Sequence, residues 1–359
     1  MSKALYIGLM SGTSLDGIDA ALVDFSTTSP KCLEFSTFAY PESLKDALHQ
    51  LNLNGTTDLS TLARLEYELG IAYSAATHLL LQSAELTPEA IQAIGSHGQT
   101  IFHDPNIPMS LQIGHPAFIA KHTRITTVAD FRIDDMANLG QGAPLAPAFH
   151  KTLFNLNEPT AIVNIGGIAN ISVVHNGKVI GFDTGPGNGL MDEICQQRLD
   201  LPYDQDGKQA AAGTVDELLL KHLQSDPYFS APYPKSTGRD KFNLNWLNAF
   251  LSMEVSTEVL LSTLNQLTAN TIADAINRFE LKRVILCGGG AENKTLVKRI
   301  ADQVAAKVET SWDYQINPNL VEAMMMAWLA KKRVHNEAIE LSSITGANKD
   351  SILGGVWHP

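Results

Sequence analysis

Ala4-Leu-Tyr-Ile-Gly-Leu-Met10 is an apolar run that leads into the loop Ser11-Gly-Thr-Ser-Leu-Asp-Gly17, and a second apolar run, 18–25, follows it. Large apolar residues closed by a turn predict a buried strand, so the two runs predict a hairpin around a Gly/Ser/Thr loop. The same order recurs later in the chain, where Thr160-Ala-Ile-Val-Asn-Ile165 enters Gly166-Gly167 and another apolar run follows. We therefore expect two copies of one strand–glycine loop–strand unit.

Helices and further strands follow each copy in the predicted order. A turn at 176–177 continues the second hairpin, because Asn-Gly between apolar runs favours a tight turn. Two such α/β units that face each other would place both glycine loops in one central cleft. The predicted helices span 42–52, 58–86, 188–198, 214–224, 255–278, 292–305 and 321–332, the further strands span 91–95, 125–131 and 283–287, and the tail 344–357 is predicted to be rich in loops.

Composition narrows the class of protein. A chain of 359 residues predicts about two domains. The formal net charge of −12 argues against nucleic acid or an anionic membrane surface as the partner, since both need a basic face. The three cysteines are widely spaced, so a disulfide framework is not expected. No apolar run is long enough to predict a membrane span, and a cytoplasmic protein is therefore expected.

The first loop has the composition of a phosphate site. Backbone N–H groups of a glycine turn form a concave site for an anion, and Ser and Thr hydroxyls add donors. Asp16 and Asp19 are candidates to hold Mg²⁺ through water. An ordinary hairpin turn capped by Asp side chains is the open alternative.

Two further glycine clusters follow predicted strands. Gly166-Gly167 ends the strand 160–165, and Gly288-Gly289-Gly290 ends the strand 283–287 ahead of a helix. Glycines at such a position let a phosphate or a flat ring approach the backbone, although a β-bulge is the alternative for the first cluster. Neither a G-x-G-x-x-G nor a Walker motif is present, which disfavours Rossmann and P-loop proteins.

Asp183 is the candidate catalytic acid–base residue. It lies in Phe182-Asp-Thr-Gly-Pro-Gly-Asn188, at the end of a predicted strand and just before a predicted helix. A carboxylate fixed at that place is suited to general base catalysis. A helix N-cap is the alternative, although Thr184 and Asn188 are equally able to cap.

Three polar segments offer groups that suit a polyhydroxylated substrate, and a fourth offers groups that suit phosphate. Paired donors and acceptors occur in 95–100, 130–132 and 140–142, and each residue alone is also explained as a satisfied loop residue. Lys235-Ser-Thr-Gly-Arg239 is a basic loop that is suited to meet phosphate, with a solvated turn as the alternative.

Taken together, these motifs resemble the anhydro-N-acetylmuramic acid kinase family, which belongs to the sugar kinase/Hsp70/actin superfamily. The resemblance extends from about Met10 to the tail near residues 343–346. It rests on M-S-G-T-S-L-D-G-I-D, G-S-H-G-Q-T, V-A-D-F-R, G-Q-G-A-P-L, N-I-G-G-I-A-N, F-D-T-G-P-G-N, P-K-S-T-G-R and C-G-G-G.

The resemblance implies an α/β, two-lobed, actin-like ATPase fold with duplicated ribonuclease H-like cores around a central cleft. It places residues 1–127 and about 340–359 in an N-terminal lobe and 128–339 in a C-terminal lobe. Asp183 is implied as the catalytic base. The implied ATP- and phosphate-binding residues are Gly12, Thr13, Ser14, Leu15, Asp16, Gly17, Ile18, Asp19, Gly166, Gly167, Gly288, Gly289 and Gly290, and the implied sugar-binding residues are His97, Gln99, Thr100, Asp130, Arg132 and Glu322.

The implied reaction uses ATP and Mg²⁺ and belongs to cell-wall (peptidoglycan) recycling. Water opens the anhydro ring of 1,6-anhydro-N-acetylmuramic acid, and O6 receives the γ-phosphoryl group, which gives N-acetylmuramic acid 6-phosphate. The family also suggests a homodimer. Two alternatives stay open at this point: another small-molecule kinase of the superfamily, and a nucleotide-gated module like a chaperone, because a shared fold alone does not decide function.

Overall fold

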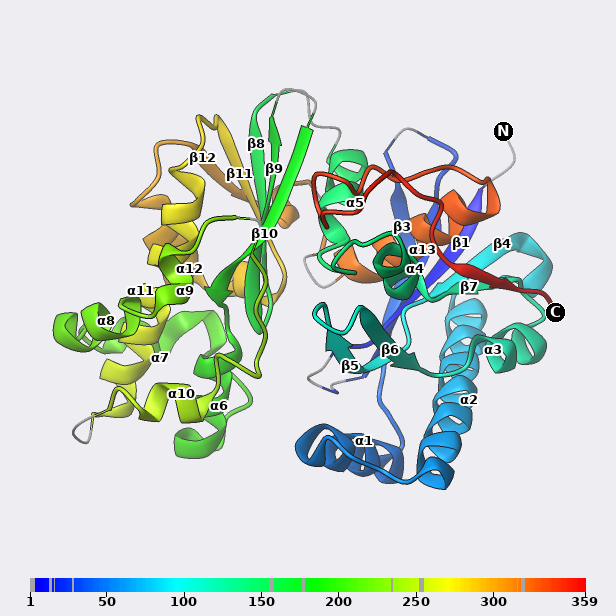
Figure 1. Ribbon diagram of the computed structural model, residues 1–359, viewed down its shortest axis with the longest axis horizontal. Helices are drawn as coiled ribbons and strands as arrows, with labels where there is room; N and C mark the ends of the chain where they lie inside the picture. The colour runs from blue at the N-terminus through cyan, green and yellow to red at the C-terminus, as the bar shows by residue number, and fades with distance from the viewer. Residues whose placement is uncertain are drawn as a thin grey trace. The chain divides into compact units, whose positions relative to one another are not determined.

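The chain divides into two compact units, which the ribbon diagram shows (Figure 1). One unit comprises residues 1–155 and 320–359, and the other comprises residues 156–319. The computed structural model describes residues 4–12, 15, 17–27, 29–154, 158–175, 178–233, 235–251, 255–314, 316–317 and 320–359.

The first unit contains a six-stranded sheet in the order β13-β7-β4-β1-β2-β3. β1 is antiparallel to β2, and β2 is antiparallel to β3, whereas β4 and β7 continue the sheet parallel to β1. The glycine loop 11–17 connects β1 to β2 as predicted. The strands are β1 (Leu5–Met10), β2 (Ile18–Asp24), β3 (Lys31–Phe38), β4 (Ile91–Ser96), β7 (Thr127–Ala129) and β13 (Gly355–Trp357).

The second unit repeats this arrangement in its own sheet, β10-β9-β8-β11-β12. Its first three strands are again antiparallel neighbours, and its last two are parallel to the first. One strand order used twice gives the duplicated ribonuclease H-like cores of the actin-like fold, so the predicted fold class is confirmed. The strands are β8 (Thr160–Ile165), β9 (Ile168–His175), β10 (Lys178–Pro186), β11 (Arg283–Cys287) and β12 (Lys307–Thr310).

Two helices cover the sheet of the first unit. α2 (Leu59–Ser83) packs against β2 and β3, and its Leu65 and Leu69 join the alternate β1 side chains in one buried cluster. α13 (Val321–Val334) packs on β1, β2 and β4. Gly8 in β1 meets this helix so closely that a Cβ there would lie 1.8 Å from the Ala323 carbonyl oxygen.

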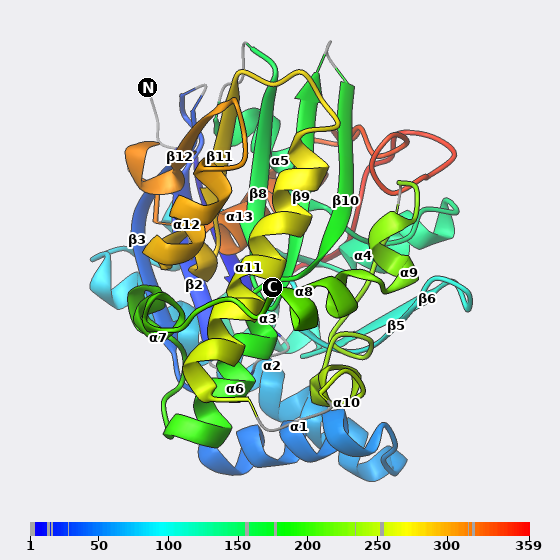
Figure 2. The same cartoon turned by 90° about the vertical axis from the view of Figure 1, so that its left-hand side faces the viewer.

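In the second unit, α11 (Thr257–Ile276) and α12 (Lys294–Ala301) bury the sheet residues of β8 and β11. Figure 2 shows α11 crossing the face of the sheet beside β9 and β10. The opposite side of α11 packs with α6 (Gly189–Leu199) and α8 (Glu217–Gln224) in another buried cluster.

The remaining elements are short. β5 and β6 form a separate antiparallel hairpin. They and the other helices are β5 (Gln99–Asp104), β6 (Met109–Ile113), α1 (Glu42–Asn54), α3 (Pro116–Thr123), α4 (Phe131–Ala137), α5 (Ala146–Leu153), α7 (Lys208–Ala212), α9 (Pro227–Ser230) and α10 (Leu244–Asn248), with 3₁₀ turns η1 (Pro88–Ala90), η2 (Gln205–Gly207), η3 (Gly289–Glu292) and η4 (Ser311–Tyr314).

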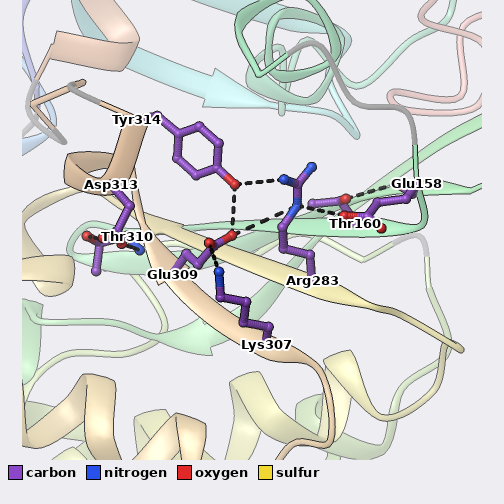
Figure 3. A network of polar contacts seen from close by, with 8 residues as sticks. All are labelled: Glu158, Thr160, Arg283, Lys307, Glu309, Thr310, Asp313 and Tyr314. Carbon is purple, nitrogen blue, oxygen red and sulfur yellow. Dashed lines mark hydrogen bonds and ion pairs between the residues drawn. The ribbon is translucent and has the colours of Figure 1, made fainter.

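An ionic network at the start of β11 ties the second unit together (Figure 3). The Arg283 guanidinium donates to the Tyr314 hydroxyl at 2.9 Å and lies 3.5 Å from a Glu158 carboxylate oxygen. Tyr314 in turn donates to Glu309 at 2.8 Å. Through Arg283, the network therefore links Glu158, which precedes β8, to Tyr314 at the end of η4.

The unit boundaries differ from the predicted ones at 127 and 340. β7 pairs with β4, and α5 packs against α13, so the chain as far as 155 belongs with the first sheet. α13 belongs there too, because its contacts are with β1 and β4. Across the described part of the chain, no helix is long and apolar enough to cross a membrane.

Candidate active site

Asp183 lies within β10, opposite Asn170 of β9, and the ladder shifts register between Asp183 and Gly185. The prediction was that Asp183 ends a strand, but β10 continues to Pro186, so Asp183 lies three residues before the strand end. The alternative that it caps a helix is wrong, since α6 begins at Gly189 and the N-cap position belongs to Asn188. Asp183 is half-buried.

The segment 228–237 surrounds Asp183 with hydrogen-bond partners. The backbone N–H of Asp183 donates to the Lys235 carbonyl at 3.0 Å, and the Asp183 carbonyl accepts from the Tyr228 hydroxyl at 2.8 Å. The carboxylate oxygen Oδ2 accepts from the Ser236 hydroxyl and from the Thr237 backbone N–H, both at 2.9 Å. Burial and the nearby charge of Asp183 raise the pKa of Tyr228, so Tyr228 is a neutral donor.

The glycine turn of the second unit packs against the start of α6. The backbone N–H groups of Gly187 and Gly189 donate to the Gly167 carbonyl at 3.0 and 3.2 Å, and that of Asn188 donates to the Gly166 carbonyl at 2.7 Å. Only glycine fits at position 187, because a Cβ would lie 2.2 Å from the Gly166 oxygen. Two motifs that are separate in sequence thus form one backbone cluster.

The third glycine segment joins this cluster. A Cβ at Gly290 would lie 2.3 Å from the Ile165 side chain. Gly288 has a φ of 75°, and a Cβ there would lie 2.4 Å from the Asn164 side chain. Gly289 differs, since a Cβ there would meet only the Asn188 side chain at 3.8 Å. The outer pair, Gly288 and Gly290, thus serves packing, and the exposed Gly289 presents its backbone outward.

Arg239 lies beside the same cluster. Its side chain is 3.4 Å from where a Gly167 Cβ would be, and its guanidinium pairs with Glu193 of α6. It is the cation nearest to this glycine turn among the contacts that the structure describes. Lys235 is engaged elsewhere, because its Nζ donates to the Tyr228 and Phe229 carbonyls.

In the first loop, the predicted residues Thr13, Ser14 and Asp16 lie outside the described residues. Leu15 and Ile18 are buried in the core, so only their backbone groups are available to a ligand. Gly17 packs tightly on β3, where a Cβ would lie 2.7 Å from the Phe38 carbonyl oxygen. Asp19 is half-buried and accepts a 2.6 Å hydrogen bond from Thr37.

Gln99 supports this first loop from inside. Its side chain is fully buried, donates to the Gly12 carbonyl at 3.3 Å and accepts from the Tyr40 hydroxyl at 3.3 Å. Ser11 bonds the Tyr73 hydroxyl beside it. Burial raises the pKa of Tyr73 well above its ordinary value, so this hydroxyl keeps its proton. Gln99, which was predicted to bind sugar, thus supports the first loop.

The buried His97 and the half-buried Arg132 form a hydrogen-bonded pair. The Arg132 Nε–H donates to His97 Nε2 at 2.9 Å, so His97 Nδ1 carries the proton and donates to the Gly98 carbonyl at 2.8 Å. Burial, with the Arg132 charge, lowers the pKa of His97 to about 3. His97 is therefore a neutral acceptor that orients Arg132, whose Nη1 donates to the Gly142 carbonyl at 2.9 Å.

Three further candidates belong to the first unit. Asp130 has a φ of 63° just before α4, and burial raises the pKa of its carboxyl. Glu322 lies in the first turn of α13, and burial raises its pKa, while the Arg132 charge lowers it and the Asp19 charge raises it. Thr100 accepts a 3.1 Å hydrogen bond from Gln112. Arg132 and Asp19 thus both lie within electrostatic reach of Glu322.

Among the residues that the structure describes, no three His, Cys, Asp or Glu side chains form a metal-binding group. The oxygen donors of Asp19 nevertheless have the chemistry that Mg²⁺ prefers, and this ion usually takes only one or two protein carboxylates. The charge repulsion between Asp19 and Glu322 is also of the kind that a nearby cation relieves.

Sequence reasoning missed several residues that the site uses. Ser236 and Thr237 lie in the predicted basic loop, whose sequence gives no sign of a contact with Asp183, and no motif marks Tyr228. Tyr40, just before α1, and Tyr73, in α2, support the first loop although both are far from it in sequence. No local pattern marks these residues, because their roles come from tertiary contacts.

Comparison with known proteins identifies the family. The family model described as anhydro-N-acetylmuramic acid kinase matches residues 4–359. A protein of that name from Hydrogenovibrio crunogenus is 56% identical over 359 residues, covering 99% of this chain and 98% of the relative. Relatives of the same name from Vibrio cholerae and Pasteurella multocida are 44% and 43% identical, covering 99% and 98% of this chain and 99% and 96% of their own lengths. With its two ribonuclease H-like units and its strand-borne Asp183, the chain belongs to the anhydro-N-acetylmuramic acid kinase family.

Proposed function

We propose that this protein is an ATP-dependent kinase that opens 1,6-anhydro-N-acetylmuramic acid with water and phosphorylates O6, giving N-acetylmuramic acid 6-phosphate. The observation that carries the proposal is Asp183, a half-buried carboxylate in β10 whose Oδ2 accepts two hydrogen bonds. The family match supports this reaction over another superfamily kinase or a chaperone-like module.

Asp183 acts as the general base in this reaction. Its carboxylate takes a proton from a water molecule whose oxygen bonds to C1 of the sugar, while the C1–O6 bond breaks. O6 then bonds to the γ-phosphorus of ATP, and the bond to the ADP oxygen breaks. Phosphoryl transfer of this kind depends mainly on positioning and charge stabilisation.

The glycine segments supply the phosphate contacts. We assign backbone groups of 12–19, Gly166-Gly167 and 288–290 to ATP, with Gly289 as the place of closest approach because it has open space around it. Asp16 and Asp19 are the residues that would hold Mg²⁺, through water. When bound, Mg²⁺ neutralises charge on the phosphates.

The sugar contacts divide into direct and indirect ones. We assign Asp130, Arg132, Thr100 and Glu322 to direct contact with the sugar. His97 acts through Arg132, and Gln99 acts through the Gly12 carbonyl. We expect the protein to work as a homodimer in the cytoplasm.

An ATP-dependent assay with the anhydro sugar tests this function. The product mass should correspond to addition of one water and one phosphoryl group, and ¹⁸O from labelled water should appear at C1. A phosphorylated product that keeps the anhydro ring, or ADP release without sugar dependence, would contradict the proposal.

A further inference from the structure

The segment Lys235–Arg239 has a polar composition that suggested a phosphate-binding loop, but its described contacts point inward. Lys235 Nζ donates to the Tyr228 carbonyl at 2.9 Å and to the Phe229 carbonyl at 3.3 Å, and it lies 4.4 Å from the centre of the Tyr228 ring. Burial, with the Arg278 charge, lowers the pKa of Lys235. The lysine therefore fastens the segment to α9.

Once fastened, the segment meets Asp183 at both its peptide and its side chain. The Lys235 carbonyl accepts from the Asp183 backbone N–H, and the Ser236 hydroxyl and Thr237 N–H donate to Oδ2. On the other side, the Tyr228 hydroxyl donates to the Asp183 carbonyl. Asp183 is thus held by the consecutive residues Lys235, Ser236 and Thr237 and, on its other side, by Tyr228 of α9.

Two donors on one oxygen have a definite effect on a carboxylate. They fix the rotation of the carboxyl group, and they favour its charged form over its protonated form. A general base needs both properties, because it must be charged and must be aimed at the proton it removes. Donors to Oδ2 are therefore expected to act on turnover.

The far end of the same segment contacts the second glycine turn. The Arg239 side chain packs against Gly167, and its guanidinium pairs with Glu193 of α6. One short segment thus contacts both the base and a proposed phosphate-binding turn. This continuity gives the segment a role in the reaction that a solvated turn would not have.

We propose that Ser236 is a positioning residue that, together with the Thr237 backbone N–H, holds the Asp183 carboxylate charged and oriented for water activation. The proposal rests on the function assigned above. Ser236 lies in the loop that the sequence suggested for phosphate binding, but in this proposal it acts on the reaction through Asp183.

Steady-state kinetics of the full-length protein with ATP and the anhydro sugar test this role. Ser236→Ala removes one donor and leaves the peptide N–H of Thr237 in place. Ser236→Thr keeps a hydroxyl at the same position. Ser225→Ala is the matched control, because Ser225 is an exposed serine of the same unit whose hydroxyl donates to the His222 carbonyl.

We expect kcat of Ser236→Ala to fall about tenfold, the loss that corresponds to a hydrogen bond to a charged group. The KM for ATP should stay within about twofold of wild type, and Ser236→Thr should restore most of kcat. The acid limb of the kcat–pH profile should move to higher pH in Ser236→Ala, since the lost donor favoured the charged carboxylate. Ser225→Ala should match wild type.

The opposite results overturn the proposal separately from the function. If wild type turns over the anhydro sugar and Ser236→Ala has the kcat and pH profile of Ser225→Ala, Ser236 does not position the base. A fall in kcat with an unmoved acid limb also contradicts positioning. So does a fall in kcat that is accompanied by a loss of thermal stability, because the substitution has then damaged the fold. If wild type does not turn over the sugar, the assigned function fails first and this role fails with it.

Discussion

At the scale of single residues, the most direct prediction concerns Asp183. Asp183→Asn keeps the size of the side chain and the hydrogen bonds of the residue's backbone, but it removes the basic carboxylate. Because a general base typically contributes about 10²- to 10⁴-fold, kcat should fall by that amount while ATP binding and thermal stability stay near wild type. Stopped assays measure kcat, nucleotide titration measures ATP binding, and thermal denaturation measures stability.

Asp200→Asn is the matched control for this substitution. Asp200 follows α6 with a φ of 54°, a conformation that Asn also tolerates, and it lies in the same unit. This control should keep full activity. Turnover of Asp183→Asn close to that of Asp200→Asn would refute the role of the base.

Arg132 carries a second prediction at this scale. Its Nε–H bonds His97 and its Nη1 bonds Gly142, so the planar guanidinium is fixed from two sides. Lysine cannot reproduce that fork. Arg132→Lys should raise the KM for the sugar about tenfold or more and leave the KM for ATP unchanged. Equal effects on both KM values would show that Arg132 supports the fold rather than the sugar.

The buried His150 predicts a pH dependence of stability. Burial lowers its pKa to about 3, whereas an unfolded histidine titrates near 6.5. Below about pH 6.5 the unfolded chain binds a proton that the folded chain rejects. The free energy of unfolding should therefore decrease as pH falls from about 6.5 toward 3, by about 1 kcal/mol per pH unit from this residue.

Urea denaturation of wild type and His150→Leu at pH 7, 6, 5 and 4 measures this contribution. Leucine keeps an apolar side chain in the site and cannot titrate. The variant should lose stability less steeply with acid than wild type. Parallel curves would mean that His150 does not contribute to the acid sensitivity.

At the scale of elements, the packing of α13 on the sheet predicts a large effect at Gly95 in β4. A Cβ there would lie 1.9 Å from the Met326 carbonyl oxygen, which is backbone and cannot turn away. Gly95→Ala should reduce the free energy of unfolding by about 3 kcal/mol or more, or prevent folding. Chemical denaturation measures this loss.

Gly289→Ala is the control that separates packing from binding. Its Cβ would enter open space, so the free energy of unfolding should change by less than about 0.5 kcal/mol. If backbone at this position approaches the nucleotide, the KM for ATP should rise in Gly289→Ala although stability is kept. A stable variant with unchanged KM would remove Gly289 from the nucleotide site.

The elements also show which parts of the fold are readable from sequence. The buried strands β1, β8 and β11 were predicted nearly to the residue, because their apolar runs end in glycine turns. β3 and β12 were not predicted, since they are largely half-exposed and lack a continuous apolar run. β13 was predicted as loop, because three residues form a strand only through their pairing with β7.

The site divides along the same line. Asp183 and the glycine turns were predicted, since strand ends and glycine clusters are local patterns. The strand predicted over 125–131 ends at Ala129, and α4 begins at Phe131, which moves Asp130 to the junction between them. The support of Asp183 by Ser236 depends on residues far apart in the chain, and no spacing rule reveals it.

At the scale of the whole molecule, the two units differ in how the chain builds them. The second unit is one continuous segment, 156–319, with its own buried clusters. The first unit needs two segments, because α13 covers β1 and β4. A chain ending at residue 319 would expose the apolar face that Ala323, Ala327 and their neighbours cover.

This difference predicts how fragments behave. The fragment 156–319 should unfold cooperatively in a calorimeter, whereas the fragment 1–155 should show no cooperative transition. Adding 320–359 in trans should restore structure to 1–155, because it supplies α13 and β13. A cooperative transition in 1–155 alone would show that α13 is not required for the core.

The split of the first unit also has a consequence for biosynthesis. Domains generally fold in the order in which the ribosome releases them, the N-terminal one first. Here the first sheet lacks α13, one of its two covering helices, and its edge strand β13 until 320–359 has been made, whereas the second unit is complete earlier. During translation, the earlier part of the first unit must wait with an uncovered apolar face, and the later unit is the one that can fold beside the ribosome.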